Sequence, residues 1–302
     1  MKIKLKIKKI RGSKDGKVLV ENFISLSLLQ VAGYLFPLIT IPYLARVIGV
    51  DKFGEIAFAS AVIIYCITIV DWGFNYTATR DVAKNRDNIE KISEIFSNVM
   101  WARLFLMAVS FIILVIMILI VPKFQEMTPL LLITFCIVPG HILFPEWLFQ
   151  GLERMKYITI LNLLAKLFFT IAVFVFIKEK SDFILQPLFV TFGFFLSGII
   201  SMYIIMIKWN IKLYRPSLYS LKSTIKKSAD VFLNNLTPNL YNSFSTLLMG
   251  FLGGAVAVGK LDAGSKFVNV AQQFMTVIAR TFYPFLSRRM DKHDLYTKIS
   301  VY

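Results

Sequence analysis

The sequence has 302 residues, of which 57% are hydrophobic, 15% are aromatic and only 17% are charged. Soluble domains carry about 25% charged residues, so this composition excludes an ordinary soluble protein. The mean hydropathy of +0.66 and repeated apolar stretches of about 20 residues predict helices that span a lipid bilayer. The sequence does not show the alternation of apolar and polar residues that is typical of membrane β-barrels. We therefore predict an all-α polytopic membrane protein.

The chain begins with a basic stretch, residues 1–21, and continues with about eight predicted spans. The basic stretch lacks the short apolar region and cleavage site of a signal peptide, so we interpret it as a tail that fixes orientation. Contact of this tail with anionic lipid headgroups is the alternative. The spans are expected near residues 22–47, 53–78, 99–121, 129–150, 157–177, 183–207, 229–256 and 261–286.

Lysine and arginine are distributed unevenly between the breaks that separate these spans. If the N-terminus is cytoplasmic, the inner breaks hold 25 of the 34 basic residues and the outer breaks hold 6. This asymmetry follows the positive-inside rule, and it predicts that both the N-terminus and segment 79–98 are cytoplasmic. The formal net charge of +16 is then a consequence of membrane topology, and no nucleic-acid partner is expected.

A dense group of charges follows the second predicted span, in the stretch DWGFNYTATRDVAKNRD (71–87). Asp71 and Trp72 are expected at the cytoplasmic end of that span, where tryptophan anchors at the membrane interface. For Asp71 we expect a salt bridge to a neighbouring cation, with proton coupling as the alternative. Arg80 is expected in a cytoplasmic loop, where it either captures a lipid headgroup or acts as an ordinary positive-inside anchor.

The features that could indicate an enzyme are weak. The stretch GAVAVGKL (254–261) nearly matches a phosphate-binding loop, but a leucine stands where the magnesium-binding hydroxyl is required. His141 and Glu146 could form an acid–base pair, but a spacing of five residues does not place them on one helix face. Cys66 and Cys136 lie in apolar spans, and we expect both to be buried thiols. We therefore predict no metal, no cofactor and no catalytic activity.

Polar residues recur at helical spacing inside the fifth, seventh and eighth predicted spans. These stripes consist of Thr159, Asn162, Lys166 and Thr170, then Asn235, Asn239, Asn242 and Thr246, and then Asp262, Lys266, Asn269, Gln273, Thr276 and Arg280. An ionised group at the bilayer centre costs about 3 kcal/mol or more, so Lys166, Lys266 and Arg280 are expected to line one cavity that takes an anionic cargo. For the amide side chains, hydrogen bonding between helices is the alternative. Asp262 is expected to pair with Lys266.

A shift of 205 residues places the seventh and eighth spans on the first and second. Gly49 then aligns with Gly254, and Gly54 aligns with Gly259. The match predicts two parallel repeats of six spans, of which the second contains only two; either the chain is a fragment or the match is accidental. The predicted organisation is a basic cytoplasmic tail (1–21), a first six-helix lobe (22–207), a cytoplasmic linker (208–228) and an incomplete second lobe (229–302).

Three segments of the chain resemble a known family. Residues 43–104, beginning YLARVIGVDKFGEIAF, are similar to the first third of a Wzx-type O-antigen flippase, a polysaccharide transporter of the MOP superfamily. The stretch FPEWLFQGLERMKYITILNLLAK (144–166) resembles that family's junction between the fourth and fifth spans, and residues 260–290 resemble its eighth span. The resemblance implies a MATE-like bundle of twelve or more helices, of which about eight are present here.

The resemblance also implies a function. The family moves undecaprenyl-pyrophosphate-linked oligosaccharides, such as the O-antigen repeat unit, from the cytoplasmic to the periplasmic leaflet of the bacterial inner membrane. The implied partners are the lipid-linked oligosaccharide, membrane lipid, a polysaccharide polymerase and a chain-length regulator. A MATE-like multidrug antiporter is the first alternative, and a membrane-embedded glycosyltransferase or acyltransferase is the second. The cations within the spans favour an anionic cargo over a cationic drug.

Overall fold

The computed structural model describes the backbone of residues 14–287. Side chains are described between residues 21 and 268, except for 22–24, 26, 30, 34 and 235–242. The described residues divide into two compact units, with the boundary between Lys260 and Leu261.

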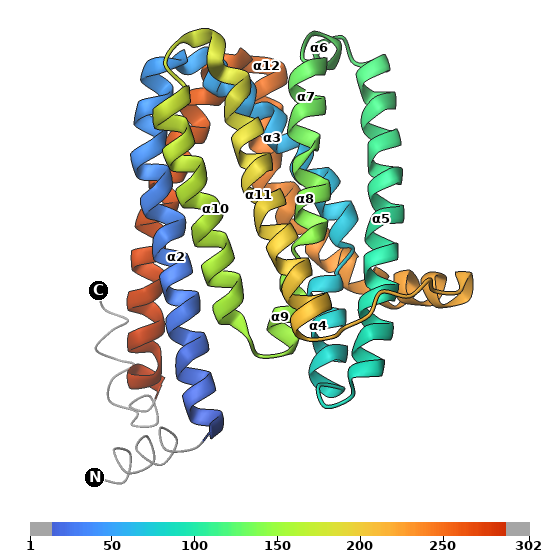
Figure 1. The fold of residues 1–302 in the computed structure, drawn as a ribbon. Helices are drawn as coiled ribbons and strands as arrows, with labels where there is room; N and C mark the ends of the chain where they lie inside the picture. The colour runs from blue at the N-terminus through green and yellow to red at the C-terminus, as the bar shows by residue number, and fades with distance from the viewer. Residues whose placement is uncertain (1–13, 288–302) are drawn as a thin grey trace. The chain divides into compact units, whose positions relative to one another are not determined.

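Helices account for all the regular secondary structure of the described residues (Figure 1). The α-helices are α2 (Lys14–Val47), α3 (Gly49–Asp71), α4 (Phe74–Lys84), α5 (Ile89–Ile120), α6 (Pro122–Glu126), α7 (Thr128–Phe135), α8 (Ile137–Leu143), α9 (Glu146–Gly151), α10 (Met155–Phe176), α11 (Leu185–Tyr203) and α12 (Leu218–Ser287). The last of these, α12, consists of two helical stretches joined at a kink, because the backbone of Gly254 is not helical. A 3₁₀ turn, η1 (Lys180–Ile184), precedes α11, and a π turn, η2 (Ile204–Lys208), follows it.

Seven stretches within the described part of the chain are long and apolar enough to cross a membrane. They are Ser27–Val47, Gly49–Lys84, Ile89–Ile120, Thr128–Gly151, Met155–Phe176, Lys180–Lys208 and Ser243–Val268. Each overlaps one of the first seven predicted spans, which confirms an all-α polytopic membrane protein. The eighth predicted span, 261–286, extends beyond the described side chains and stays a prediction.

The charged stretch after the second span is helical, and the predicted loop over 79–98 is wrong. Helix α4 continues to Lys84, and α5 begins at Ile89, ten residues before the predicted start of the third span. The Asn88 side chain caps α5 by accepting a hydrogen bond of 3.0 Å from the Lys91 backbone N–H. Lysine, arginine and glutamate are good helix formers. The run of charges therefore marks where the chain becomes polar and does not mark where its helices end.

Helices distant in the sequence pack side by side within residues 1–260. Helix α10 packs against α2 and α11, and α11 packs in turn against α8 (Figure 1). Helix α3 packs against α5 and α7, while α4 packs against α9. The fourth predicted span is divided into α7, α8 and α9, with breaks at Cys136 and at Phe144–Pro145. These breaks position His141 on α8 opposite the end of α3.

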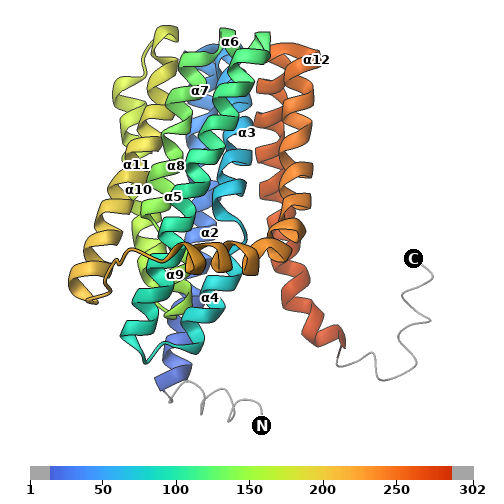
Figure 2. The same ribbon diagram turned by 90° about the vertical axis from the view of Figure 1, so that its right-hand side faces the viewer.

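The first turns of α12 lie across α4 and α5 (Figure 2). The chain reaches this position through residues 209–217, which follow the side of α5. There the Ser97 hydroxyl accepts a hydrogen bond of 2.8 Å from the Tyr214 backbone N–H, and the Trp101 indole donates one of 3.1 Å to the Tyr214 carbonyl. The predicted cytoplasmic linker, 208–228, therefore consists of an extended strap and the first turns of a helix, both fixed to the preceding helices.

Candidate functional site

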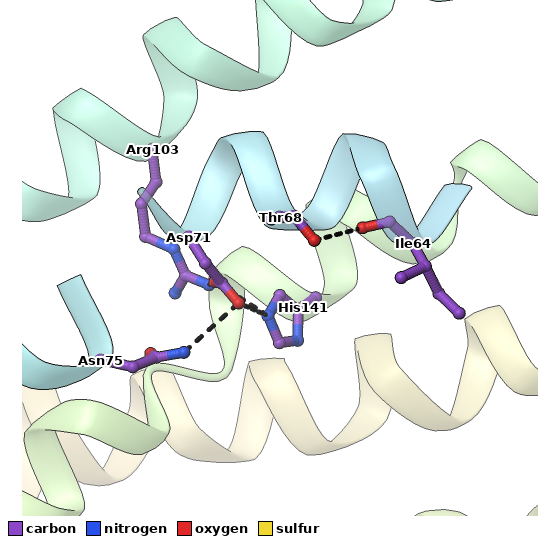
Figure 3. Close-up of polar contacts among 6 residues, drawn as sticks. All are labelled: Ile64, Thr68, Asp71, Asn75, Arg103 and His141. Atoms are coloured by element: carbon purple, nitrogen blue, oxygen red, sulfur yellow. Dashed lines mark hydrogen bonds and ion pairs between the residues drawn. The ribbon is translucent and has the colours of Figure 1, made fainter. Parts of the chain in front are cut away.

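A charged cluster lies where α3 ends. Trp72 and Gly73 have φ of 42° and 78°, and this left-handed backbone separates α3 from α4. Asp71, the last residue of α3, is held at this break by three helices (Figure 3). Its carboxylate accepts a bond of 2.5 Å from the Arg103 guanidinium of α5 and one of 3.3 Å from the Asn75 amide of α4. The His141 Nε2 of α8 lies 3.1 Å from the same carboxylate.

Arg103 is the most deeply buried charge of this cluster. Its side chain is 2% exposed, whereas those of Asp71 and His141 are 21% and 23% exposed. The Arg103 Nε and Nη1 have no hydrogen-bond partner among the described residues. A cation in this position depends on its counter-ion, because removal of one partner leaves a buried charge uncompensated. The salt bridge predicted for Asp71 is therefore present, and Asp71 is the ionic partner of Arg103.

A second polar cluster surrounds Lys166 on α10. The Lys166 ammonium lies against Gly33 of α2, 3.5 Å from where a side chain on that glycine would begin. Glu146, at the start of α9, is near enough to attract this ammonium electrostatically. The Glu146 carboxylate also accepts a hydrogen bond of 2.8 Å from the Asn162 amide. Asn162 of the predicted fifth-span stripe is thus bound by a carboxylate from a neighbouring helix, and the charge of that carboxylate also acts on Lys166.

The arrangement separates the two residues that the sequence offered as an acid–base pair. His141 contacts Asp71, whereas Glu146 contacts Asn162, so each is bound to a different polar cluster. Among the described residues, no group of three or more His, Cys, Asp or Glu side chains could hold a metal ion. Neither observation tests the predictions that the protein has no metal and no catalytic activity.

The structure describes the side chains of only some of the remaining predicted site residues. Lys266 pairs with Asp262 at 2.6 Å, as the spacing predicted. Arg80 is exposed on α4, and its guanidinium lies 3.8 Å from the Asp81 carboxylate. The other predicted site residues have side chains outside the described residues; they are Asn235, Asn239, Asn242, Asn269, Gln273 and Arg280. Because Lys166 and Lys266 belong to different compact units, their shared cavity stays a prediction.

Sequence reasoning missed Arg103, because it counted this residue among the cytoplasmic basic residues although it lies within the third predicted span, 99–121. The signal was present in the spacing of α5, whose buried face includes Phe96, Val99, Arg103, Leu106 and Ser110 at steps of three and four. Arg103 occupies a position of this stripe where an apolar residue is expected. A cation at a core position of a membrane helix indicates a partner from another helix.

The fold and these clusters define an α-helical, multi-pass membrane protein in which charged side chains of different helices interact inside the helical bundle. The model of the polysaccharide biosynthesis protein family matches residues 19–290. The chain therefore belongs to this family, which confirms the family predicted from the sequence.

Two curated relatives carry the name "Putative O-antigen transporter". The relative from Escherichia coli (strain K12) is 31% identical over 266 residues, which cover 88% of this chain and 64% of the relative. The relative from Shigella dysenteriae is 28% identical over 282 residues, which cover 93% of this chain and 70% of the relative. The chain thus spans less than two thirds of the length of the first of these proteins. The comparison with solved structures found no match.

Proposed function

We propose that this protein is a flippase that moves an undecaprenyl-pyrophosphate-linked oligosaccharide across the bacterial inner membrane. The observation that carries the proposal is the family match over residues 19–290, together with relatives named for O-antigen transport. In this proposal the N-terminus is cytoplasmic, and the glycan passes from the cytoplasmic to the periplasmic leaflet. A polysaccharide polymerase and a chain-length regulator are the proposed downstream partners.

The charge of the membrane-embedded groups favours this cargo over a cationic drug. Lys166 lies midway along α10 and forms no ion pair within the described part of the chain. We propose that Lys166, Lys266 and Arg280 provide a positive potential for the pyrophosphate, and that the polar side chains of the same stripes bind the sugars. Arg280 can hold phosphate oxygens in a bidentate fork, which a lysine cannot do. Replacement of Arg280 by Lys should therefore reduce export more than replacement of Lys266 by Arg.

Export of glycan to the cell surface tests the proposal. The chain is expressed in a strain that lacks its own O-antigen transporter, and surface O-antigen is quantified with antibody. Crosslinking to a photoreactive lipid-linked oligosaccharide in isolated membranes gives a second readout that does not require transport. If the inserted protein neither restores surface glycan nor crosslinks to the oligosaccharide, the proposed function is wrong.

Lys166 provides the sharper form of the test, because α10 contains a matched control. Lys166→Gln removes the charge within the bundle, whereas Lys156→Gln removes one from an exposed pair with Glu21. Lys166→Gln should reduce export strongly, and Lys156→Gln should leave it near the unmodified level. Equal export by both variants would reject the role of Lys166. Resistance to cationic drugs without glycan export would instead identify the multidrug antiporter.

A further inference from the structure

A cavity of about 330 Å³ lies between α4, the first turns of α5 and the first turns of α12. It is separate from the Asp71 and Lys166 clusters, since none of the charged residues of those clusters lines it. Figure 2 shows α12 crossing the two other helices at this position. The charge distribution of the sequence predicts that this end of the bundle is cytoplasmic.

Specific contacts fix the α12 wall of this cavity against the earlier helices. Lys227 of α12 forms an ion pair of 2.5 Å with Asp81 of α4. The hydroxyls of Ser228 and Thr77 are 2.7 Å apart, and both residues are buried. Beside them, the Trp72 indole donates a hydrogen bond of 2.9 Å to the backbone carbonyl of Ile225. The cavity is therefore preformed, as is typical of small-molecule sites.

The lining of the cavity has two chemical zones. Apolar surface that a ligand can reach comes from Ile95, which is half-buried, and from the ring of Tyr219, which is exposed, whereas Phe74 and Val99 are 1% and 2% exposed. The second zone consists of Asn98, Ser220 and Ser223, which offer amide and hydroxyl groups. The side chains of Asn98 and Ser223 make no hydrogen bond within the described part of the chain, so both are available to a ligand.

The charges around the cavity are already paired. Besides the pair between Lys227 and Asp81, Lys91 forms an ion pair of 2.7 Å with Glu94. Both lysines of the lining are thus engaged by carboxylates, and the lining contributes two cations and two anions. A phosphate group needs free cationic donors, and an acyl chain needs an apolar surface throughout. Neither ligand matches this cavity.

We infer that the cavity binds one uncharged sugar residue. The C–H face of a pyranose ring would pack on Ile95 and Tyr219, while its hydroxyls would bond the Asn98 amide. The volume is near the lower end of the range of roughly 300–1,000 Å³ for small-molecule sites, which suits one sugar ring better than an oligosaccharide. That this sugar belongs to a lipid-linked glycan rests on the proposed function; a soluble saccharide has the same chemistry.

Protection of a single cysteine tests the inference. Ser223→Cys is made in a Cys136→Ser background, because Cys136 is exposed, contrary to the prediction from the sequence, whereas Cys66 is buried as predicted. The labelling rate with a maleimide is measured on the purified chain in nanodiscs. Lys222→Cys is the matched control, since Lys222 immediately precedes Ser223 on α12, is exposed and does not line the cavity.

Three ligands distinguish the sources of the sugar. They are a neutral oligosaccharide linked to undecaprenyl pyrophosphate, the same oligosaccharide released from the lipid, and undecaprenyl pyrophosphate alone. At about ten times the dissociation constant of the lipid-linked glycan, labelling at position 223 should slow about tenfold, because only the unoccupied cavity reacts. Equal protection by the released oligosaccharide also supports the inference and identifies a site open to soluble saccharides. Labelling at position 222 should not change.

Two results would overturn the inference. One is an unchanged labelling rate at position 223 with both oligosaccharide ligands. The other is protection by undecaprenyl pyrophosphate alone, which would identify a lipid or phosphate site. Asn98→Leu, which keeps the branched shape of the side chain but removes the amide, should abolish protection by the glycans. Protection without glycan export would reject the proposed function and keep the sugar site, whereas export without protection would reject the sugar site alone.

Discussion

Asp71 and Arg103 form an ion pair, and removing one partner should destabilise the protein more than removing the other. In Asp71→Asn the amide keeps nearly the same volume and can still accept a hydrogen bond, but the Arg103 charge loses its counter-ion. In Arg103→Met the buried charge disappears, and Asp71 retains its contacts with His141 and Asn75. We expect Asp71→Asn to be the more destabilising change.

The burial of the two side chains sets the expected magnitudes. Arg103 is 2% exposed and has no other ion-pair partner among the described residues, so Asp71→Asn should cost about 3–5 kcal/mol. Asp71 is 21% exposed, and Arg103→Met removes one charge-assisted hydrogen bond, so its cost should be about 1–2 kcal/mol. The exposed pair between Arg86 and Glu153 provides a control, and Arg86→Met should cost less than about 1 kcal/mol.

The assay is reversible unfolding in mixed micelles, followed by circular dichroism as the fraction of denaturing detergent increases. The double variant completes a mutant cycle, whose coupling energy should be about 1–3 kcal/mol. The reasoning is refuted if Arg103→Met destabilises the protein at least as much as Asp71→Asn. It is also refuted if the coupling energy is below about 0.5 kcal/mol, the limit for independent sites.

Three further predictions concern topology, packing and cargo. A cysteine at position 178 should react with an impermeant maleimide from the periplasm and one at position 84 only from the cytoplasm; the reverse pattern would contradict the predicted orientation. Gly54→Ala should destabilise the protein by about 1–3 kcal/mol in the same unfolding assay, because its side chain would overlap the Ala255 carbonyl oxygen, whereas Gly264→Ala, in open space, should be nearly neutral. Lys166→Gln should weaken crosslinking to a photoreactive lipid-linked oligosaccharide more than to its uncharged lipid alcohol, and equal weakening of both would exclude a role in binding phosphate.

The sequence was sufficient to predict the helical fold, because burial in a bilayer leaves few alternatives. Apolar stretches of membrane length identified seven of the predicted spans, each of which overlaps a described helix. Composition was a poorer guide to helix ends. A water-exposed helical turn is as polar as a loop, so the continuation of helix around Arg80 was missed, as was the start of α5 at Ile89.

The candidate site was predicted in part, since helical spacing reveals neighbours only along one helix. The pairing of Lys266 with Asp262 follows from a spacing of four residues and was predicted correctly. The Glu146 carboxylate, twenty positions before Lys166, acts on it electrostatically only because α9 and α10 pack together. The contact between Asp71 and His141 joins residues 70 positions apart, and no local pattern specifies it. Such pairs become visible only when the helix packing is known.

The glycines at the 205-residue repeat favour a true repeat over an accidental match. Gly49 and Gly254, which the shift aligns, both have positive φ, at 82° and 77°. A side chain added at Gly54 would overlap the Ala255 carbonyl oxygen, and one added at Gly259 would overlap the Val50 carbonyl oxygen. The shift that aligns Gly54 with Gly259 also aligns Val50 with Ala255, so the two contacts are the same contact made in both directions. Reciprocal contacts of this kind arise where two equivalent units meet across a two-fold axis. An accidental match of glycine spacing has no reason to produce them.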